Sequence, residues 1–102
     1  MRTIQFDVNQ QRIKNIDKIT FIYPGTDNYI QLKFKFSEDW NGCAKGIAFG
    51  KREELVALLL DKNDCCTVPK EAFDEKELVF YLVGKKKPNY RIQTQKFVIK
   101  LS

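Results

Sequence analysis

The sequence contains no histidine, and it has few cysteines, prolines and glycines: 3, 3 and 5 among 102 residues. The missing histidine excludes a Ser-His-Asp or Cys-His catalytic group, a histidine general base and His-ligated zinc. The glycines never have the spacing of a GxGxxG or P-loop motif, so no phosphate-binding loop is indicated. With 43% hydrophobic and 30% charged residues, the composition is typical of a folded chain and not of low-complexity disorder.

Long apolar segments are absent too. The longest purely apolar run, residues 55–60, is too short to cross a bilayer, so we expect no membrane insertion. The first residues, MRTIQ, lack the apolar core of a signal peptide, and we expect a chain that is not secreted by one. A length of 102 residues fits one domain, residues 1–102, with a single core between two packed layers.

The three cysteines match no zinc or redox motif. Cys43 stands alone, whereas Cys65 and Cys66 are adjacent. Neighbouring side chains on a strand point to opposite faces, so this pair would not readily chelate one ion or form a disulfide. We therefore expect reduced core or strand residues, with a reactive thiol as the alternative, and no cofactor or metal is indicated.

Apolar and polar residues alternate with a period of two, which predicts β-strands. The clearest strand covers residues 30–36, where Phe34 and Phe36 alternate with Lys33 and Lys35. Further strands are predicted at residues 4–8, 19–23, 46–49, 55–60, 78–83 and 97–101. A short helix is the alternative for residues 55–60.

This pattern predicts an all-β fold: a single antiparallel β-sandwich, immunoglobulin-like, of seven to eight short strands. One short helical turn is expected near residues 69–73, because Pro69 followed by Glu71 is typical of a first helical turn.

The segment FSEDWNG at residues 36–42 holds the only tryptophan, Trp40, beside Glu38 and Asp39. The two carboxylates could act as an acid/base pair next to an aromatic platform, as in a sugar-cleaving site. Alternatively, Trp40 fills one end of the sandwich while the acids cap the bend. No second catalytic cluster accompanies them, so the sequence favours a protein that is not an enzyme.

Basic residues give the chain a formal net charge of +5. Lys33 and Lys35 share one strand face, and a positive hairpin tip carries an aromatic residue. Together these candidates for a binding surface are Lys33, Lys35, Lys85, Lys86, Lys87, Tyr90 and Arg91. Such residues could bind a single-stranded nucleic acid, although no RNA-binding or helix-turn-helix signature is present. Lysines on a sheet also protect its edges against aggregation.

Several short motifs follow one another between residues 17 and 102. They are NY at 28–29, FKFSEDW at 34–40, KGIAF at 45–49, CTVPKE at 66–71, FYLVG at 80–84 and the strand 94–101. Their order and spacing resemble a family of immunoglobulin-like modules of phages that infect Gram-positive hosts. In that family, such N-terminal domains fix head fibres or baseplate receptor-binding proteins to the virion.

The resemblance implies a β-sandwich used in virion attachment, without a catalytic site. The residues it implies for the core and turns are Trp40, Phe34, Phe36, Pro69, Phe80 and Gly84. Family modules usually precede a fibre or receptor-binding region, whereas the sequence given ends at Ser102. An isolated piece of a longer fibre protein and a free-standing relative both stay open.

Three functions follow as hypotheses. The first is a phage structural or attachment module that binds a protein partner in a head fibre, capsid decoration or baseplate. It would form a homo-oligomer in an assembly, in the virion or in the host cytoplasm during assembly. The second is a phage-encoded inhibitor of a host enzyme or defence nuclease. The third is a weak single-stranded nucleic-acid binder, whose binding would weaken steeply with salt.

Overall fold

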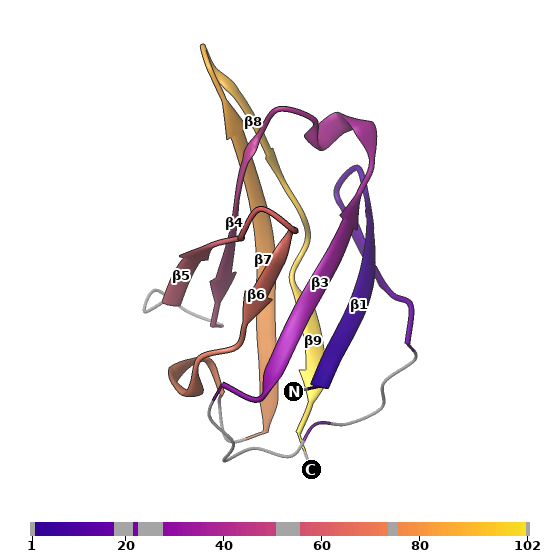
Figure 1. Cartoon of the computed structure of the whole chain (residues 1–102), viewed down its shortest axis with the longest axis vertical. Coiled ribbons are helices and arrows are strands. Elements are labelled where there is room, and N and C mark those ends of the chain that lie inside the picture. The colour runs from indigo at the N-terminus through magenta and orange to yellow at the C-terminus, as the bar shows by residue number, and fades with distance from the viewer. Residues whose placement is uncertain (1, 18–21, 23–27, 51–55, 74–75, 102) are drawn as a thin grey trace.

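Two β-sheets pack face to face in the computed structural model (Figure 1). The structure describes residues 2–17, 22, 28–50, 56–73 and 76–101. The strands in this part of the chain are β1 (Arg2–Asn9), β2 (Arg12–Asn15), β3 (Ile30–Phe36), β4 (Ala44–Phe49), β5 (Val56–Leu59), β6 (Cys65–Thr67), β7 (Glu77–Lys86), β8 (Tyr90–Gln93) and β9 (Phe97–Lys100). Two short 3-10 turns, η1 (Glu38–Trp40) and η2 (Lys70–Ala72), complete the described elements.

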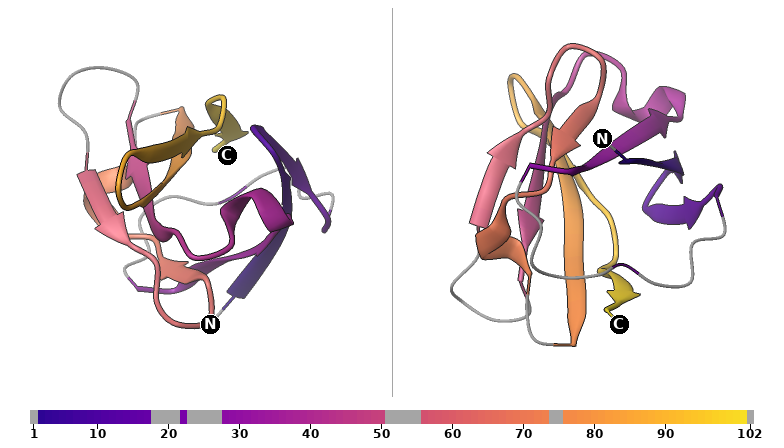
Figure 2. Two further views of the ribbon diagram at one scale, coloured as in Figure 1. Left: turned by 90° about the horizontal axis from the view of Figure 1, so that it is seen from above. Right: turned by 60° about the horizontal axis from the view of Figure 1, so that its bottom comes forward.

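The first sheet has the strand order β2-β1-β3-β6, and the second has the order β5-β4-β7-β8, with β9 also pairing with β7. Seen from above in Figure 2, the two sheets form separate layers. The all-β sandwich expected from the sequence is therefore confirmed, and the helical turn expected near residues 69–73 is η2, which begins after Pro69.

One pairing differs from the expected antiparallel arrangement. Strands β1 and β3 run parallel, in a register that pairs Arg2 with Ile30 and Val8 with Phe36. A parallel neighbour needs a long crossover, and the connection from β2 to β3, residues 16–29, is long enough for one. The alternation of residues along a strand carries no information on the direction of its neighbour, so the sequence could not show this pairing.

Strands β2, β6 and β8 were not predicted, because each holds at most two apolar residues, too few to show a period of two. Of the predicted strand 19–23, only Ile22 is described; it forms an isolated parallel bridge with Leu101, and the other four residues lie outside the described part. Residues 56–59 of the segment 55–60 form a strand and not a helix, and residue 55 is not described.

The core lies between the inner faces of the two sheets. In β1 and β3 the alternation directs one side chain in two inward, which buries Phe6 and Phe34. Their rings stack with centroids 5.3 Å apart, and Phe80 of β7 packs edge-on against both, at 5.5 and 5.9 Å. Burying an aromatic side chain contributes about 1.5–3 kcal/mol, so this cluster accounts for a large part of the sandwich's stability.

Trp40 closes one end of the core from η1. Its side chain is completely buried, its indole N–H donates to the backbone oxygen of Gln10 at 2.8 Å, and its ring lies 4.9 Å from that of Phe36. The opposite side of the ring meets Gly84 of β7. A Cβ atom at Gly84 would lie 2.7 Å from Cε3 of Trp40, so this position has no room for a side chain.

Replacing Gly84 by alanine should destabilise the fold by about 1–3 kcal/mol, because the added methyl group overpacks a buried ring. The clash is with Cε3 and Cζ3 of Trp40, which belong to the six-membered part of the indole. In a Trp40→Phe background the same Gly84→Ala substitution should therefore cost measurably less. Chemical denaturation of the four proteins checks this; strictly additive losses of stability would contradict the proposed contact.

Candidate binding surface

The acidic pair near the tryptophan does not have the Trp40 ring as an aromatic platform. Glu38 and Asp39 lie exposed on η1, but the Trp40 ring is buried beneath them and its N–H is already bonded. A carboxylate oxygen of Asp39 accepts a hydrogen bond from the Ser37 hydroxyl at 3.2 Å. Trp40 therefore fills one end of the sandwich, as the second alternative of the sequence analysis expects, and its ring offers no stacking surface for a sugar. The two acids do not cap the turn, because η1 has no side-chain cap hydrogen bond.

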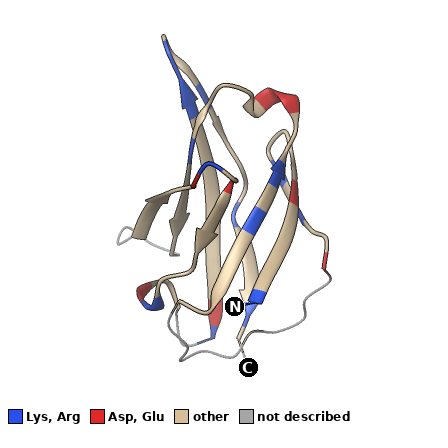
Figure 3. Cartoon of the chain, viewed as in Figure 1, with Lys and Arg blue, Asp and Glu red and all other residues tan. Residues whose placement is uncertain are grey.

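The basic candidates come from both sheets, on β3 and on the β7–β8 hairpin, and Figure 3 shows lysine and arginine on these strands. Lys33 and Lys35 are exposed on the outer face of β3, in the four-stranded sheet. Lys85 and Arg91 are register partners on the outer face of β7 and β8, in the five-stranded sheet. Because the outer faces of the two sheets point away from each other, these four cations do not line one groove.

Lys86 and Tyr90 instead hold the hairpin tip against η1. The Lys86 ammonium donates to the backbone oxygen of Asn41 at 3.2 Å and lies 4.7 Å from the centre of the Tyr90 ring. The Tyr90 hydroxyl donates to the backbone oxygen of Asp39 at 2.9 Å. Lys87, at the turn itself, is exposed. The Arg91 guanidinium donates to the side-chain oxygen of Gln93 at 2.5 Å. Three of the predicted binding residues therefore have contacts within the fold.

The outer face of the five-stranded sheet carries exposed apolar side chains, among them the most exposed large one in the described residues, Leu59. Leu59 is 80% exposed and Val98 is 48% exposed. The register places side chains from β5, β4 and β7 on this face in two rows: Leu59, Gly46 and Val83 in one, Ala57, Ala48 and Tyr81 in the next. The small residues in the middle of each row leave a groove of about 380 Å³. Lys85 and Arg91 line one end of this groove.

The outer face of the four-stranded sheet has the opposite character. Its central strands present Thr3, Gln5, Asp7 and Asn9 from β1 and Gln31, Lys33 and Lys35 from β3. A sheet that packs on one side only normally alternates in this way, with polar residues toward water. The five-stranded sheet departs from that pattern, and an exposed apolar patch rimmed by charge is typical of a protein contact surface.

The sequence analysis did not find this surface. Residues 78–83 are apolar on both faces, which is equally typical of a central strand covered on both sides. The sequence did contain a signal for this surface: Tyr81 and Val83 are apolar, and so is the whole segment 55–60. Two strands with apolar residues on both faces leave some of these side chains exposed, and Leu59 is 80% exposed.

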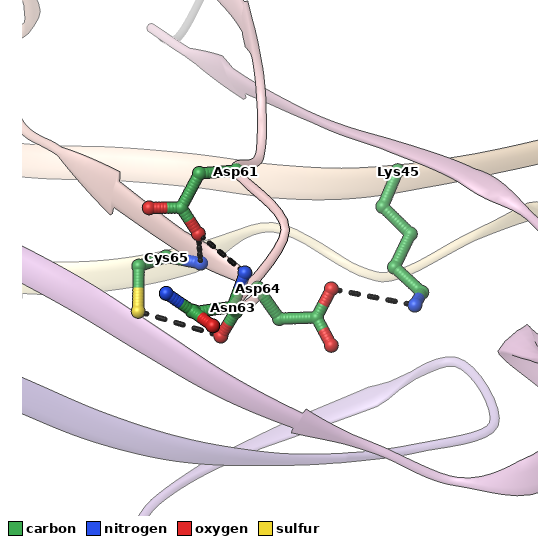
Figure 4. A network of polar contacts seen from close by, with 5 residues as sticks. All are labelled: Lys45, Asp61, Asn63, Asp64 and Cys65. Carbon is green, nitrogen blue, oxygen red and sulfur yellow. Dashed lines mark hydrogen bonds and ion pairs between the residues drawn. The ribbon is translucent and has the colours of Figure 1, made fainter.

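The loop between β5 and β6 is held by hydrogen bonds around Asp61 (Figure 4). One carboxylate oxygen of Asp61 accepts from the backbone N–H groups of Asn63 and Cys65, at 2.8 and 3.0 Å. Asp64 forms an ion pair with Lys45 at 3.3 Å. Within the described residues, no group of three or more His, Cys, Asp or Glu side chains could hold a metal ion.

The cysteines are three free thiols, of which Cys65 and Cys66 are buried and Cys43 is half-buried. Burial, and then the nearby charge of Asp61, raises the pKa of the Cys66 thiol to about 11 from its ordinary value of 9.0. Burial also raises the pKa of Cys65. Since the thiolate is the reactive form, both side chains are disfavoured as nucleophiles at neutral pH.

Comparison of the chain with protein-family models, with curated proteins and with solved structures finds no match. In the described residues, none of the helices has the length and apolar character needed to span a membrane. The resemblance to phage attachment modules accordingly stays a prediction from the sequence motifs, and the binding surface is argued from its own geometry.

The raised pKa of Cys66 predicts a loss of stability at high pH. Between about pH 9 and 11 the thiol ionises in the unfolded chain while it stays protonated in the folded one, so the unfolded state is favoured as the pH rises. Denaturant unfolding of the wild type and of Cys66→Ala at several pH values measures this. The stability difference between the two proteins should change over that window; a difference independent of pH would contradict the burial of a neutral thiol.

Proposed function

We propose that this chain is a non-enzymatic module that binds a protein partner through the outer face of its five-stranded sheet. In the specific form that the sequence motifs favour, it is a phage structural or attachment module and its partner is a subunit of the virion. The observation that carries the proposal is the exposed apolar groove between Leu59 and Val83, with Lys85 and Arg91 at one end.

The groove supports binding of a protein more than of a small molecule. It is shallow and open, it crosses three strands, and its floor consists of Gly46 and Ala48, which allow a partner side chain to approach the backbone. A partner with an apolar side chain flanked by carboxylates would bury Leu59 and pair with the two cations. Apolar contacts at the centre and charges at the rim are the usual arrangement of a protein interface.

The distribution of cations argues against nucleic acid as the partner. A single strand needs a continuous basic track with exposed aromatic rings. Here the Lys86 ammonium lies over the Tyr90 ring at 4.7 Å, and Lys33 and Lys35 lie on the sheet opposite to Lys85.

The proposal predicts that the charge pair at the groove matters and that an equal pair elsewhere does not. Lys85→Glu combined with Arg91→Glu should weaken association with the partner about tenfold, because rim charges orient the encounter. Val83→Asp should weaken it more, since it places a charge in the apolar centre. Incorporation into purified particles of the phage that encodes the chain, measured by quantitative mass spectrometry, reports the effect.

The matched control is Lys33→Glu combined with Lys35→Glu, which changes the net charge equally on the polar sheet face. This variant should be incorporated like the wild type. Equal loss in both double variants would indicate a general charge effect and contradict the groove. Absence of the wild-type chain from the particles, with a host enzyme bound at a fixed stoichiometry, would favour the inhibitor hypothesis instead.

A further inference from the structure

Among the residues that the structure describes, strand β5 forms an open edge of the five-stranded sheet. It lies at the end of the strand order and pairs with β4, from Gly46–Leu59 to Phe49–Val56. The backbone N–H of Leu60 donates to the oxygen of Lys45 at 3.0 Å. Since hydrogen-bonded residues alternate along an antiparallel pair, Leu58 also directs its backbone groups to β4. Ala57 and Leu59 consequently direct their N–H and C=O groups away from the sheet.

The other sheet protects part of its corresponding edge. At β6, the N–H of Cys65 donates to the Asp61 carboxylate at 3.0 Å (Figure 4). The backbone oxygen of Cys65 accepts from the Asp61 N–H, also at 3.0 Å. Strands β2, β8 and β9 carry lysine or arginine, which discourages pairing with another chain. Strand β5 has the sequence VALL, with neither a charged residue nor a proline.

We propose that β5 pairs antiparallel with β5 of a second copy of this chain, which joins the two five-stranded sheets into one. The register follows from the free backbone groups. Centring the pair on Leu58 sets Ala57 of each copy opposite Leu59 of the other, so both free residues of both strands are bonded. It also keeps the outer faces of the two sheets on the same side. Centring it between Ala57 and Leu58 would oppose a free residue to one already bonded to β4.

The side chains of β5 fit a second copy in particular. In this register the small Ala57 lies beside the large, 80% exposed Leu59 of the other copy, and this contact occurs twice about the two-fold axis. The two Leu58 side chains, each 38% exposed, meet on the axis. A chain with a net charge of +5 repels its own copies, so self-association requires an uncharged contact, which VALL provides.

The dimer should be weak, because four residues of strand bury less area than the roughly 1,200 Å² of a stable interface. We expect dissociation constants in the micromolar to millimolar range, at about the affinity of transient contacts. The inference does not rest on the proposed function. It has a consequence for it, however: pairing at β5 places the two outer-face grooves side by side on one continuous sheet.

The first experiment is disulfide cross-linking at the two-fold axis, in a Cys43→Ser background that removes the half-buried native thiol. Residues opposite each other in a non-hydrogen-bonded pair have Cα atoms about 4.5 Å apart, which a disulfide can bridge. Leu58→Cys should therefore form covalent dimers on mild oxidation at least about ten times faster than Leu59→Cys, whose copies lie too far apart. Equal rates for the two variants would overturn the register.

The second experiment exchanges charges on the axis and follows the mass by sedimentation velocity. Leu58→Lys and Leu58→Glu should each be monomeric, because like charges meet, and their equimolar mixture should form a heterodimer. Ala44→Lys, which adds the same charge to the outer face of β4 away from β5, should dimerise like the wild type.

Several results would overturn the proposal. A wild-type chain that stays monomeric up to millimolar concentration would show that β5 does not pair with a second copy. A mixture of Leu58→Lys and Leu58→Glu that is no more dimeric than either variant alone would show that the two Leu58 residues do not meet. Thermal unfolding verifies that each variant folds. Should the Leu58 variants fail to fold, Ala57→Pro gives the same test, since it removes a free-edge donor without affecting a bond to β4. It should abolish dimerisation, and a dimeric Ala57→Pro would contradict pairing at this edge.

Discussion

The contact between the Trp40 ring and the backbone of Gly84 is the constraint on which the upper end of the sandwich depends. No side chain fits between them, so the ring fixes how closely η1 approaches β7. The indole N–H extends the same contact to Gln10 in the turn between β1 and β2. One buried side chain thereby connects both sheets. With η1 in place, the backbone oxygen of Asp39 accepts a hydrogen bond from the Tyr90 hydroxyl. The backbone oxygen of Asn41, one residue after η1, accepts one from the Lys86 ammonium. These two bonds hold the long β7–β8 hairpin.

The hairpin in turn determines which cations reach the outer face. Side chains on β7 alternate, so fixing Lys86 toward η1 directs Lys85 to the other side, beside Arg91 of β8. The same alternation places Tyr81 and Val83 next to them on the outer face. The apolar groove and its charged end are thus a consequence of how the core is closed, and they need no separate arrangement of the backbone.

The sequence predicted the elements whose pattern is local. The alternation over residues 30–36 gave β3 and its inward Phe34, and Pro69 gave η2. The parallel pairing of β1 with β3 was not predicted, because direction depends on the course of the chain between the strands. The turn η1 was not predicted either, since Ser37 is a common residue of bends as well as of helix starts. The site was hidden because Tyr81 and Val83 resemble covered residues until the positions of all strands are known.

The positive charge acquires a clearer physical meaning from these positions. Lysines and arginines lie on the polar sheet face and on strands β2, β8 and β9, where positive charge discourages pairing with another chain. No lysine or arginine occurs in β5 or in the two apolar rows beside it. A sandwich that needed only to be stable would gain nothing from an uncharged, exposed edge next to an exposed apolar face, since both promote association. Their occurrence on the same sheet, with the opposite sheet polar and the Cys65 backbone of β6 bonded to Asp61, is the reason why we propose association on this side of the molecule.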